Sequence, residues 1–420
     1  MTYRKRIIHK GKEKMDDDAK KRVLILTADA GFGHRSVAIA IKKALELSYE
    51  DKVFVEIRNP LDDSDAPALL RESQSDYDRV VKESPELYRL GYEASDANIP
   101  TTLMESVLTI LLYEVIRENL KEFKPDVIVS TYPMYLAPLD SVLTLQRKKI
   151  PVISVITDLA SVHQIWFKKD VDVCIVPNDI VKNLAYSNGL KASQIEVCGI
   201  PVHPDFSVIK ASKKELRKSL TWNEKLPTIL VVGSSRSEQM INKLNIINHS
   251  GFDFQLILVA GNDKKLFDQF NKIDWHHPVK IYEFVSEMPK FLKAADLNLC
   301  KAGGLIITES LASGLPMLLT DVIPGQEVGN AKYVEDHTSG FQIRSDQDLV
   351  EKFYHLMVNN QDKLKELQKN AKKIGKPDSA FEAAKIIWKL ADFGQLENIK
   401  NKEKQTSIIG LLQKFNINVE

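Results

Sequence analysis

The stretch Val23-Leu-Ile-Leu-Thr-Ala-Asp-Ala-Gly-Phe-Gly-His-Arg35 decides how the first part of the chain folds. Its β-branched, apolar run is followed by two glycines and then by the amphipathic segment Ser36–Leu47, an order typical of a strand, a tight turn and a helix. Because the helix starts directly after the glycines, its free N–H groups face the turn and can bind a polar or anionic group. This pattern predicts a βα unit in which the turn either holds a ligand at the carboxyl end of the strand or only permits the strand and helix to pack closely.

The same alternation of strand and helix continues along the chain. Nearly continuous apolar runs are typical of parallel strands that helices cover on both faces. Such runs occupy residues 53–57, 127–130, 152–156, 173–176, 228–232, 254–259, 280–284, 297–300 and 317–319. Gly199-Ile-Pro-Val-His-Pro204 interrupts the pattern, so we predict a hinge there. The predicted fold class is α/β, with two doubly wound, Rossmann-like domains facing a central cleft.

The length of 420 residues suits two domains with additional terminal segments. We predict a flexible basic arm over residues 1–20, a first domain over 21–200, a second domain over 201–385 and a helical tail over 386–420. Lys and Arg number 58 against 57 Asp and Glu, so the charge balance argues against a nucleic-acid partner. The spacing of the three cysteines fits neither a zinc site nor a disulfide framework. Buried free thiols in a cytoplasmic protein are the simplest interpretation.

His34 is the first candidate catalytic residue, because it stands at the start of the first helix. The positive end of a helix favours the neutral imidazole, which can accept a proton as a general base. Asp158 and Asp29 are alternative bases, since each follows a predicted strand of the first domain. A capping role is the ordinary alternative for His34 and for Asp158.

Two turns of the second domain are candidates for binding a diphosphate. Gly233-Ser234 and Gly303-Gly304 each follow a predicted strand, and backbone N–H groups in such turns can hold phosphate oxygens. Glu309 lies in the helix after the second turn, where its carboxylate can accept hydrogen bonds from ribose hydroxyls. A solvated helix glutamate is the ordinary alternative.

Two further polar segments are candidates for sugar and acceptor binding. Ile323-Pro-Gly-Gln-Glu-Val-Gly-Asn330 places Gln326, Glu327 and Asn330 on a turn, although an ordinary Pro-Gly surface turn has the same composition. Thr157-Asp158, His163 and Trp166 combine a carboxylate, an imidazole and a flat apolar ring, which can line an acceptor pocket. Core packing is the alternative for Trp166. The acidic stretch over residues 62–65 is interpreted as a loop tip and not as a metal site.

Taken in order, these motifs resemble glycosyltransferase family 28, and within it the monogalactosyldiacylglycerol synthases and the processive diacylglycerol glucosyltransferases. The resemblance covers about Lys21–Ala384 and rests on residues 30–35, 156–166, 199–202, 301–309 and 323–330. It implies a GT-B fold and inverting transfer of a hexose from a UDP-sugar to a membrane lipid, with diacylglycerol the favoured acceptor and a β-glycosyl lipid the product. It also implies that no cofactor and no metal are required.

The resemblance assigns roles residue by residue. It places the base on His34 and the ribose contact on Glu309, and it places donor-sugar contacts on Gln326 and Glu327. Uracil is expected near Phe284 and Val285. The remaining candidates are Gly233, Ser234, Gly303, Gly304 and Asn330 for the donor, and Gly31, Phe32, Gly33, His163 and Trp166 for the acceptor. Phe32 departs from the commonest pattern, in which three glycines precede the histidine.

Two alternatives to this function remain open at this stage. One is N-acetylglucosaminyl transfer to a polyprenyl-linked cell-wall precursor, and the other is a non-catalytic sensor of nucleotide sugars. For either lipid acceptor we expect a cytoplasmic protein, bound peripherally to the inner face of the cell membrane and attracted to its anionic surface. The apolar residues in Pro100–Leu120 are too many to fit on one core-facing stripe of a helix, so this segment is the expected contact with lipid. The sequence leaves the hexose, the processivity and the oligomeric state open.

Overall fold

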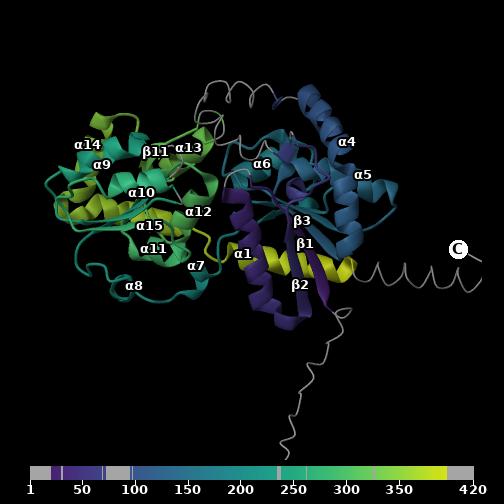
Figure 1. The fold of residues 1–420 in the computed structure, drawn as a ribbon, viewed down its shortest axis with the longest axis horizontal. Coiled ribbons are helices and arrows are strands. Elements are labelled where there is room, and N and C mark those ends of the chain that lie inside the picture. Colours follow the sequence, from purple (N-terminus) through teal and green to yellow (C-terminus); the bar gives the residue numbers. More distant parts are fainter. Residues whose placement is uncertain are drawn as a thin grey trace, which may run out of the picture.

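Two parallel sheets of six strands form the centres of two domains, which lie side by side in Figure 1. The structure is a computed structural model that describes residues 20–29, 32–68, 70–71, 95–96, 98–233, 238–261, 263–323, 325 and 327–394. Every pair of neighbouring strands is parallel, as expected when each strand is joined to the next through a helix. The predicted α/β fold class is therefore confirmed.

The first domain has the strand order β2-β1-β3-β4-β5-β6. Its strands are β1 (Lys21–Leu26), β2 (Val53–Arg58), β3 (Val127–Ser130), β4 (Val152–Val155), β5 (Val173–Val176) and β6 (Ile195–Val197). Its helices are α1 (Phe32–Tyr49), α4 (Asn98–Phe123), α5 (Leu136–Leu145) and α6 (Asp179–Ser187). Short 3₁₀ turns are η2 (Glu50–Lys52), η3 (Pro60–Asp62), η4 (Pro133–Tyr135), η5 (Gln164–Trp166) and η6 (Ala192–Gln194).

The second domain has the order β12-β11-β10-β7-β8-β9. Its strands are β7 (Thr228–Val232), β8 (Gln255–Val259), β9 (Val279–Tyr282), β10 (Leu297–Lys301), β11 (Met317–Asp321) and β12 (Gly340–Gln342). Its helices are α7 (Asp205–Val208), α8 (Lys213–Ser219), α9 (Glu238–Asn248), α10 (Lys264–Phe270), α11 (Met288–Ala294), α12 (Gly304–Ala312), α13 (Val328–Asp336), α14 (Asp346–Met357) and α15 (Asp362–Ile374), with η7 at Asn359–Gln361.

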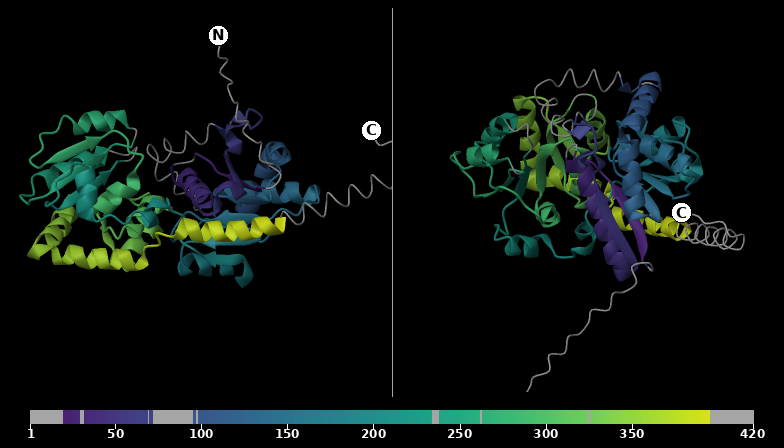
Figure 2. Two further views of the ribbon diagram at one scale, coloured as in Figure 1. Left: turned by 90° about the horizontal axis from the view of Figure 1, so that it is seen from below. Right: turned by 45° about the vertical axis from the view of Figure 1, so that its right-hand side comes forward.

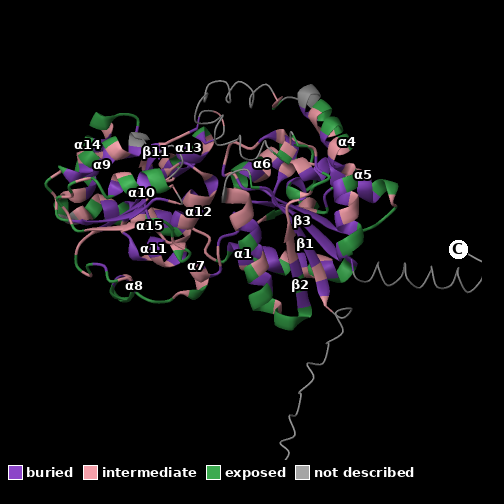
Figure 3. Ribbon diagram, in the orientation of Figure 1, coloured by how far each residue is buried: buried purple, intermediate pink, exposed green. Residues whose placement is uncertain are grey.

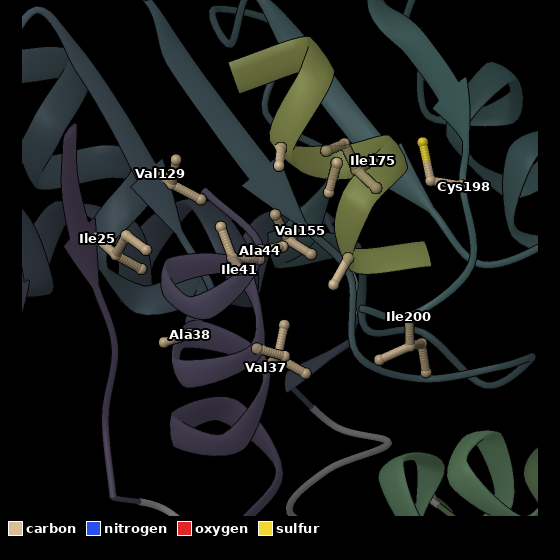
Figure 4. Close-up of a cluster of buried hydrophobic side chains, with 14 of the residues drawn as sticks. Ile25, Val37, Ala38, Ile41, Ala44, Val129, Val155, Ile175, Cys198 and Ile200 are labelled. Atoms are coloured by element: carbon tan, nitrogen blue, oxygen red, sulfur yellow. The ribbon is translucent and has the colours of Figure 1, made fainter. Parts of the chain in front are cut away.

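The sheets supply the core of each domain, because their strands are covered on both faces. The inner strands are buried almost throughout and the edge strands β2, β6, β9 and β12 only in part, whereas the helices carry exposed residues on their outer sides (Figure 3). Figure 4 shows one core cluster, in which Val37 and Ile41 of α1 pack toward Ile25, Val129 and other strand residues. This packing fixes α1, and with it the loop at the end of β1.

The C-terminal part of the chain returns to the first domain. A helix over residues 379–394, yellow in Figures 1 and 2, leaves the second domain and runs along the first. Its buried alanines share a core cluster with β1 and α1, and Trp388 stacks on Tyr49 with ring centroids 3.9 Å apart. Ser379 bonds to the backbone of Ile200 and Val202, so the two segments that join the domains lie next to each other.

Candidate active site

His34 lies in the first turn of α1, where the β1 loop meets the ends of β3 and β4. Its Nδ1 is 3.3 Å from the hydroxyl oxygen of Thr157, and its ring meets the edge of Tyr132 at a centroid distance of 5.1 Å. Burial lowers the pKa of His34 to about 4, because the charged imidazolium loses solvation, while a hydrogen bond with the backbone of Thr131 acts in the opposite direction. The imidazole is therefore neutral at pH 7, as a proton acceptor must be.

The two alternative bases have different surroundings. Burial raises the pKa of Asp158 to about 7, and the negative charge of Glu327 adds to the rise, whereas a hydrogen bond from Asn330 lowers it. Asp29 is exposed and accepts two hydrogen bonds from the Arg35 guanidinium, at 2.7 and 2.5 Å. That contact lowers the pKa of Asp29, so this carboxylate is ionised but held in an ion pair.

The rest of the β1 loop is described in part. Ala30 and Gly31 lie outside the described residues, as does the side chain of Phe32, whose backbone begins α1. Among the described atoms, none lies within 4 Å of the position of a Cβ atom on Gly33.

The other two predicted acceptor residues, His163 and Trp166, are built into the fold. His163 is the N-cap of η5: its Nδ1 accepts a hydrogen bond from the N–H of Ile165, and its Nε2 is 3.1 Å from the Ser95 hydroxyl. Burial lowers the pKa of His163, with Asp96 acting against this shift. Trp166 is almost fully buried, 6.1 Å from the His34 ring between centroids. Both side chains are therefore mostly buried.

On the second domain, β10 ends at Lys301 and α12 begins after Gly303. Gly303 is the N-cap of α12 and has no side chain to cap the helix, so the first N–H groups point outward from the helix end. The Lys301 ammonium lies 3.7 Å from the position of a Gly303 Cβ atom, and a Glu327 carboxyl oxygen lies 3.6 Å from it. Sequence reasoning gave Lys301 no role, although a cation directly before a glycine turn at a strand end was a usable signal. The α12 N-terminus and the Lys301 ammonium make this turn a candidate anion site, with the Glu327 carboxyl group beside it.

Glu309 stands further along α12. Its side chain is half-buried, and burial raises the pKa of its carboxyl group to about 8. Within the described part of the chain this carboxyl group makes no hydrogen bond or ion pair. An acceptor without a protein partner suits a ligand that brings hydroxyl donors, as the ribose prediction requires.

The remaining donor candidates differ in what they contact. The N–H of Gly233 donates to the Val259 carbonyl, and a Cβ at Gly233 would lie 2.5 Å from Leu266, so this glycine allows α10 to pack closely against the end of β7. Phe284, 59% exposed, and the half-buried Val285 lie in the loop between β9 and α11. Ser234 and Gln326 lie outside the described residues.

Glu327 and Asn330 stand at the start of α13, where the domains touch. A Glu327 carboxyl oxygen accepts the N–H of Ile323 at 2.9 Å and so closes the turn before the helix. Asn330 is fully buried and accepts the N–H of Leu159, in the first domain, at 2.9 Å. The strand ends of both domains therefore meet at one place, with His34 on one side and the α12 N-terminus on the other.

The described residues contain no group of three or more His, Cys, Asp or Glu side chains placed to hold a metal ion. None of the helices in this part of the chain combines the length and the hydropathy that a membrane crossing requires. Cys174, Cys198 and Cys300 are free and buried, and burial raises the pKa of each thiol.

Comparison with solved structures places this arrangement in the GT-B class. The chain matches MurG of Acinetobacter baumannii with a TM-score of 0.56 and 17% identity, covering 88% of this chain and 99% of that one. It matches a UDP-GlcNAc 2-epimerase from Neisseria meningitidis, bound to UDP-GlcNAc, with a TM-score of 0.53 and 14% identity, covering 88% and 98%. The fold is the two-domain GT-B architecture.

The family follows from the sequence relatives. Residues 34–202 match the monogalactosyldiacylglycerol (MGDG) synthase family, and residues 228–385 match the glycosyltransferase family 28 C-terminal domain. Monogalactosyldiacylglycerol synthase 3, chloroplastic, of Arabidopsis thaliana is 33% identical over 393 residues, covering 90% of this chain and 83% of the relative. The chloroplastic synthase of Spinacia oleracea is 32% identical, covering 87% and 72%. The chain belongs to the monogalactosyldiacylglycerol synthase family and is a glycosyltransferase.

Proposed function

We propose that the protein transfers a galactosyl group from UDP-galactose to diacylglycerol, with inversion at the anomeric carbon. This proposal is supported mainly by the contact between the two domains. At this contact Thr157 lies beside His34 and also against Gly304, at the start of α12. A candidate base and a candidate diphosphate site are thereby brought to one place. The printed names of the relatives support the choice of sugar and acceptor.

The proposed reaction is a single displacement. The acceptor hydroxyl oxygen attacks the anomeric carbon of the galactosyl group, and the bond between that carbon and the diphosphate oxygen breaks. The bonding pair leaves with UDP, and the hydroxyl proton passes to the base. His34 is our first choice because its imidazole is neutral at pH 7, with Asp158 as the alternative. An α-linked donor then gives a β-galactosyl lipid.

The negative charge that develops on the leaving UDP is met by the second domain. Helix N–H groups after Gly303 and the Lys301 ammonium are fixed in position before the reaction, so they stabilise this charge without reorganising. The Glu309 carboxylate accepts hydrogen bonds from the ribose hydroxyls, and the loop with Phe284 and Val285 binds the uracil. We propose that these groups act without a metal ion.

We propose that α4 brings the site to the membrane that holds the acceptor. Leu103, Val107 and Ile110 are 66%, 47% and 79% exposed and recur at intervals of four and three residues, so they form one outward stripe. Leu108 and Leu112, also candidates from the sequence, face the core instead. The stripe therefore offers lipid a narrower apolar surface than the sequence alone predicts.

A chain of contacts connects this stripe with His34. The Thr101 hydroxyl, in the first turn of α4, donates to the carbonyl of Ser95 at 2.8 Å, and the Ser95 hydroxyl contacts His163. His163 caps η5, whose Trp166 approaches His34. An acceptor that enters beside the start of α4 is thus directed toward the base.

The cellular place of action is also a proposal. Three buried free cysteines support a reducing cytoplasm, and we propose peripheral binding at the inner face of the cell membrane. The basic arm lies outside the described residues over 1–19, and so do three further basic residues that could attract anionic headgroups, Arg79, Lys82 and Arg89. Their contribution stays a prediction.

The function is tested by offering the purified protein UDP-galactose, UDP-glucose or UDP-N-acetylglucosamine with vesicles that contain diacylglycerol. We expect UDP release together with a galactosyl lipid, identified by mass spectrometry, with a β-anomeric proton coupling by NMR. Parallel vesicles with a polyprenyl-linked acceptor should give no product. UDP release without a galactosyl lipid would overturn the acceptor, and binding of every donor without UDP release would indicate a sensor.

A further inference from the structure

The segment Thr157–Leu159, directly after β4, is in contact with both domains. On the side of the first domain, the Thr157 hydroxyl oxygen is 3.3 Å from Nδ1 of His34. Thr157 is almost fully buried, so this hydroxyl has little access to water as an alternative partner. The side chain of Asn178, in the first domain, also donates to the Leu159 carbonyl at 2.8 Å. The segment is thus well placed to set the position of the His34 ring.

On its other side the segment is held by the second domain. A Cβ atom at Gly304 would lie 2.4 Å from the Thr157 carbonyl oxygen, so only glycine permits α12 to approach this closely. Asn330 joins the two domains with one side chain, because its Oδ1 accepts the N–H of Leu159 at 2.9 Å and its Nδ2 donates to the Ala302 carbonyl at 3.2 Å. Buried amides bonded at both ends are well fixed.

We propose that Thr157 is a positioning residue for His34, and that Asn330 is the tether through which the donor domain holds Thr157 in place. A neutral imidazole donates from one nitrogen and accepts at the other. In the Nδ1–H form the Thr157 hydroxyl accepts the Nδ1 proton, and the lone pair of Nε2 takes the proton of the acceptor hydroxyl; the backbone of Thr131, which also bonds to the ring, is the competing partner. Alignment of the base therefore requires contact between the domains. This inference rests on the proposed function of His34 as base, and it gives Asn330 a structural role in place of donor binding.

The kinetic test compares Thr157→Val, which removes the hydroxyl and keeps the shape, with Thr157→Ser, which keeps the hydroxyl. Thr228→Val is the matched control, because Thr228 is a buried threonine with a bonded hydroxyl at the far end of β7. We expect Thr157→Val to lower kcat about tenfold, as loss of one oriented hydrogen bond would, with KM for UDP-galactose changed less than about twofold. The serine variant should recover most of kcat. Unchanged kcat in Thr157→Val, or no recovery in Thr157→Ser, would overturn the positioning role.

The tether is tested with Asn330→Ala and the double variant Thr157→Val/Asn330→Ala, after circular dichroism shows that both are folded. If Asn330 acts through Thr157, the double variant loses no more kcat than the more affected single variant. If the loss of kcat in the double variant equals the product of the two single losses, Asn330 acts by another route, and the tether would be overturned.

A measurement without turnover separates this inference from the proposed function. Long-range ¹H–¹⁵N NMR correlations of the His34 ring, assigned with His34→Gln, report which nitrogen carries the proton. We expect the Nδ1–H form in the unmodified protein and a mixture of both forms in Thr157→Val. Finding the Nε2–H form in the unmodified protein overturns the inference whether or not sugar is transferred. With the Nδ1–H form present, an active His34→Ala variant would overturn only the base role.

Discussion

Donor binding should depend on pH through Glu309, and this dependence can be worked out from the surroundings of its carboxyl group. A pKa raised to about 8 means that the carboxyl is mostly protonated at pH 7 in the free protein. Ribose hydroxyls bind best to the ionised form, which accepts at every lone pair. The folded, unliganded protein resists this ionisation below pH 8, so binding must drive loss of the proton.

The expected size follows from linkage. If only the ionised form binds, the affinity for UDP-galactose rises about 50-fold between pH 6 and pH 8 and then levels off, and binding at pH 7 releases about 0.9 proton. UDP-galactose is the suitable ligand because its diphosphate is esterified at both ends and does not titrate in this range. Replacing Glu309 with Gln should remove the pH dependence and weaken binding at pH 8 by about 1 to 3 kcal/mol.

Isothermal titration calorimetry in two buffers of different ionisation enthalpy measures both the affinity and the released protons. Glu351→Gln, an exposed glutamate of α14, is the matched control and should behave like the unmodified protein. An affinity that stays constant from pH 6 to pH 9, or a Glu309→Gln variant with the original pH dependence, would refute the assignment.

Three further outcomes are expected. His34→Ala should lower kcat about 100-fold or more while UDP-galactose affinity by calorimetry is retained, because positioned proton transfer is lost and the donor site is not. If His34, with a pKa of about 4, is the base, the kcat of the unmodified protein should not change from pH 6 to pH 9. A kcat that rises with pH and levels off near pH 7 would assign the role of base to Asp158. The double variant Leu103→Glu/Ile110→Glu should reduce co-sedimentation with lipid vesicles. The control Val350→Glu, at an exposed apolar residue of α14, should not reduce it. Equal sedimentation of both variants would exclude the α4 stripe as the membrane contact.

Most of the fold could be predicted because parallel strands have a strong local signature. All ten expected apolar runs are strands, and the runs at 127–130, 173–176 and 228–232 have the same bounds in the structure. The two strands that the sequence did not reveal, β6 and β12, have three residues each and lie at sheet edges. Strands this short contain too few residues for a pattern of burial to appear.

Only those parts of the site that lie in turns directly after strands could be predicted from the sequence. The glycine turns located the starts of α1 and α12 to within a few residues, because a turn and a helix start leave local signals. The expected start of the first helix after the glycines was wrong, since α1 begins at Phe32 and contains Gly33. The bond between Asn330 and Leu159 joins residues 171 positions apart in different domains, and no local pattern encodes it. Likewise, the apolar residues of α4 are too many for periodicity to separate core-facing Leu112 from exposed Ile110.

The return of the helix over residues 379–394 to the first domain has a consequence for how the protein is made. The buried side chains of this helix complete a core cluster whose other members include Val23 and Ile41, near the start of the chain. During synthesis the first domain leaves the ribosome early, yet one face of it stays uncovered until the last part of the second domain has been translated. We expect the isolated first domain to aggregate when it is expressed alone, and to become soluble when a peptide spanning residues 376–394 is supplied with it.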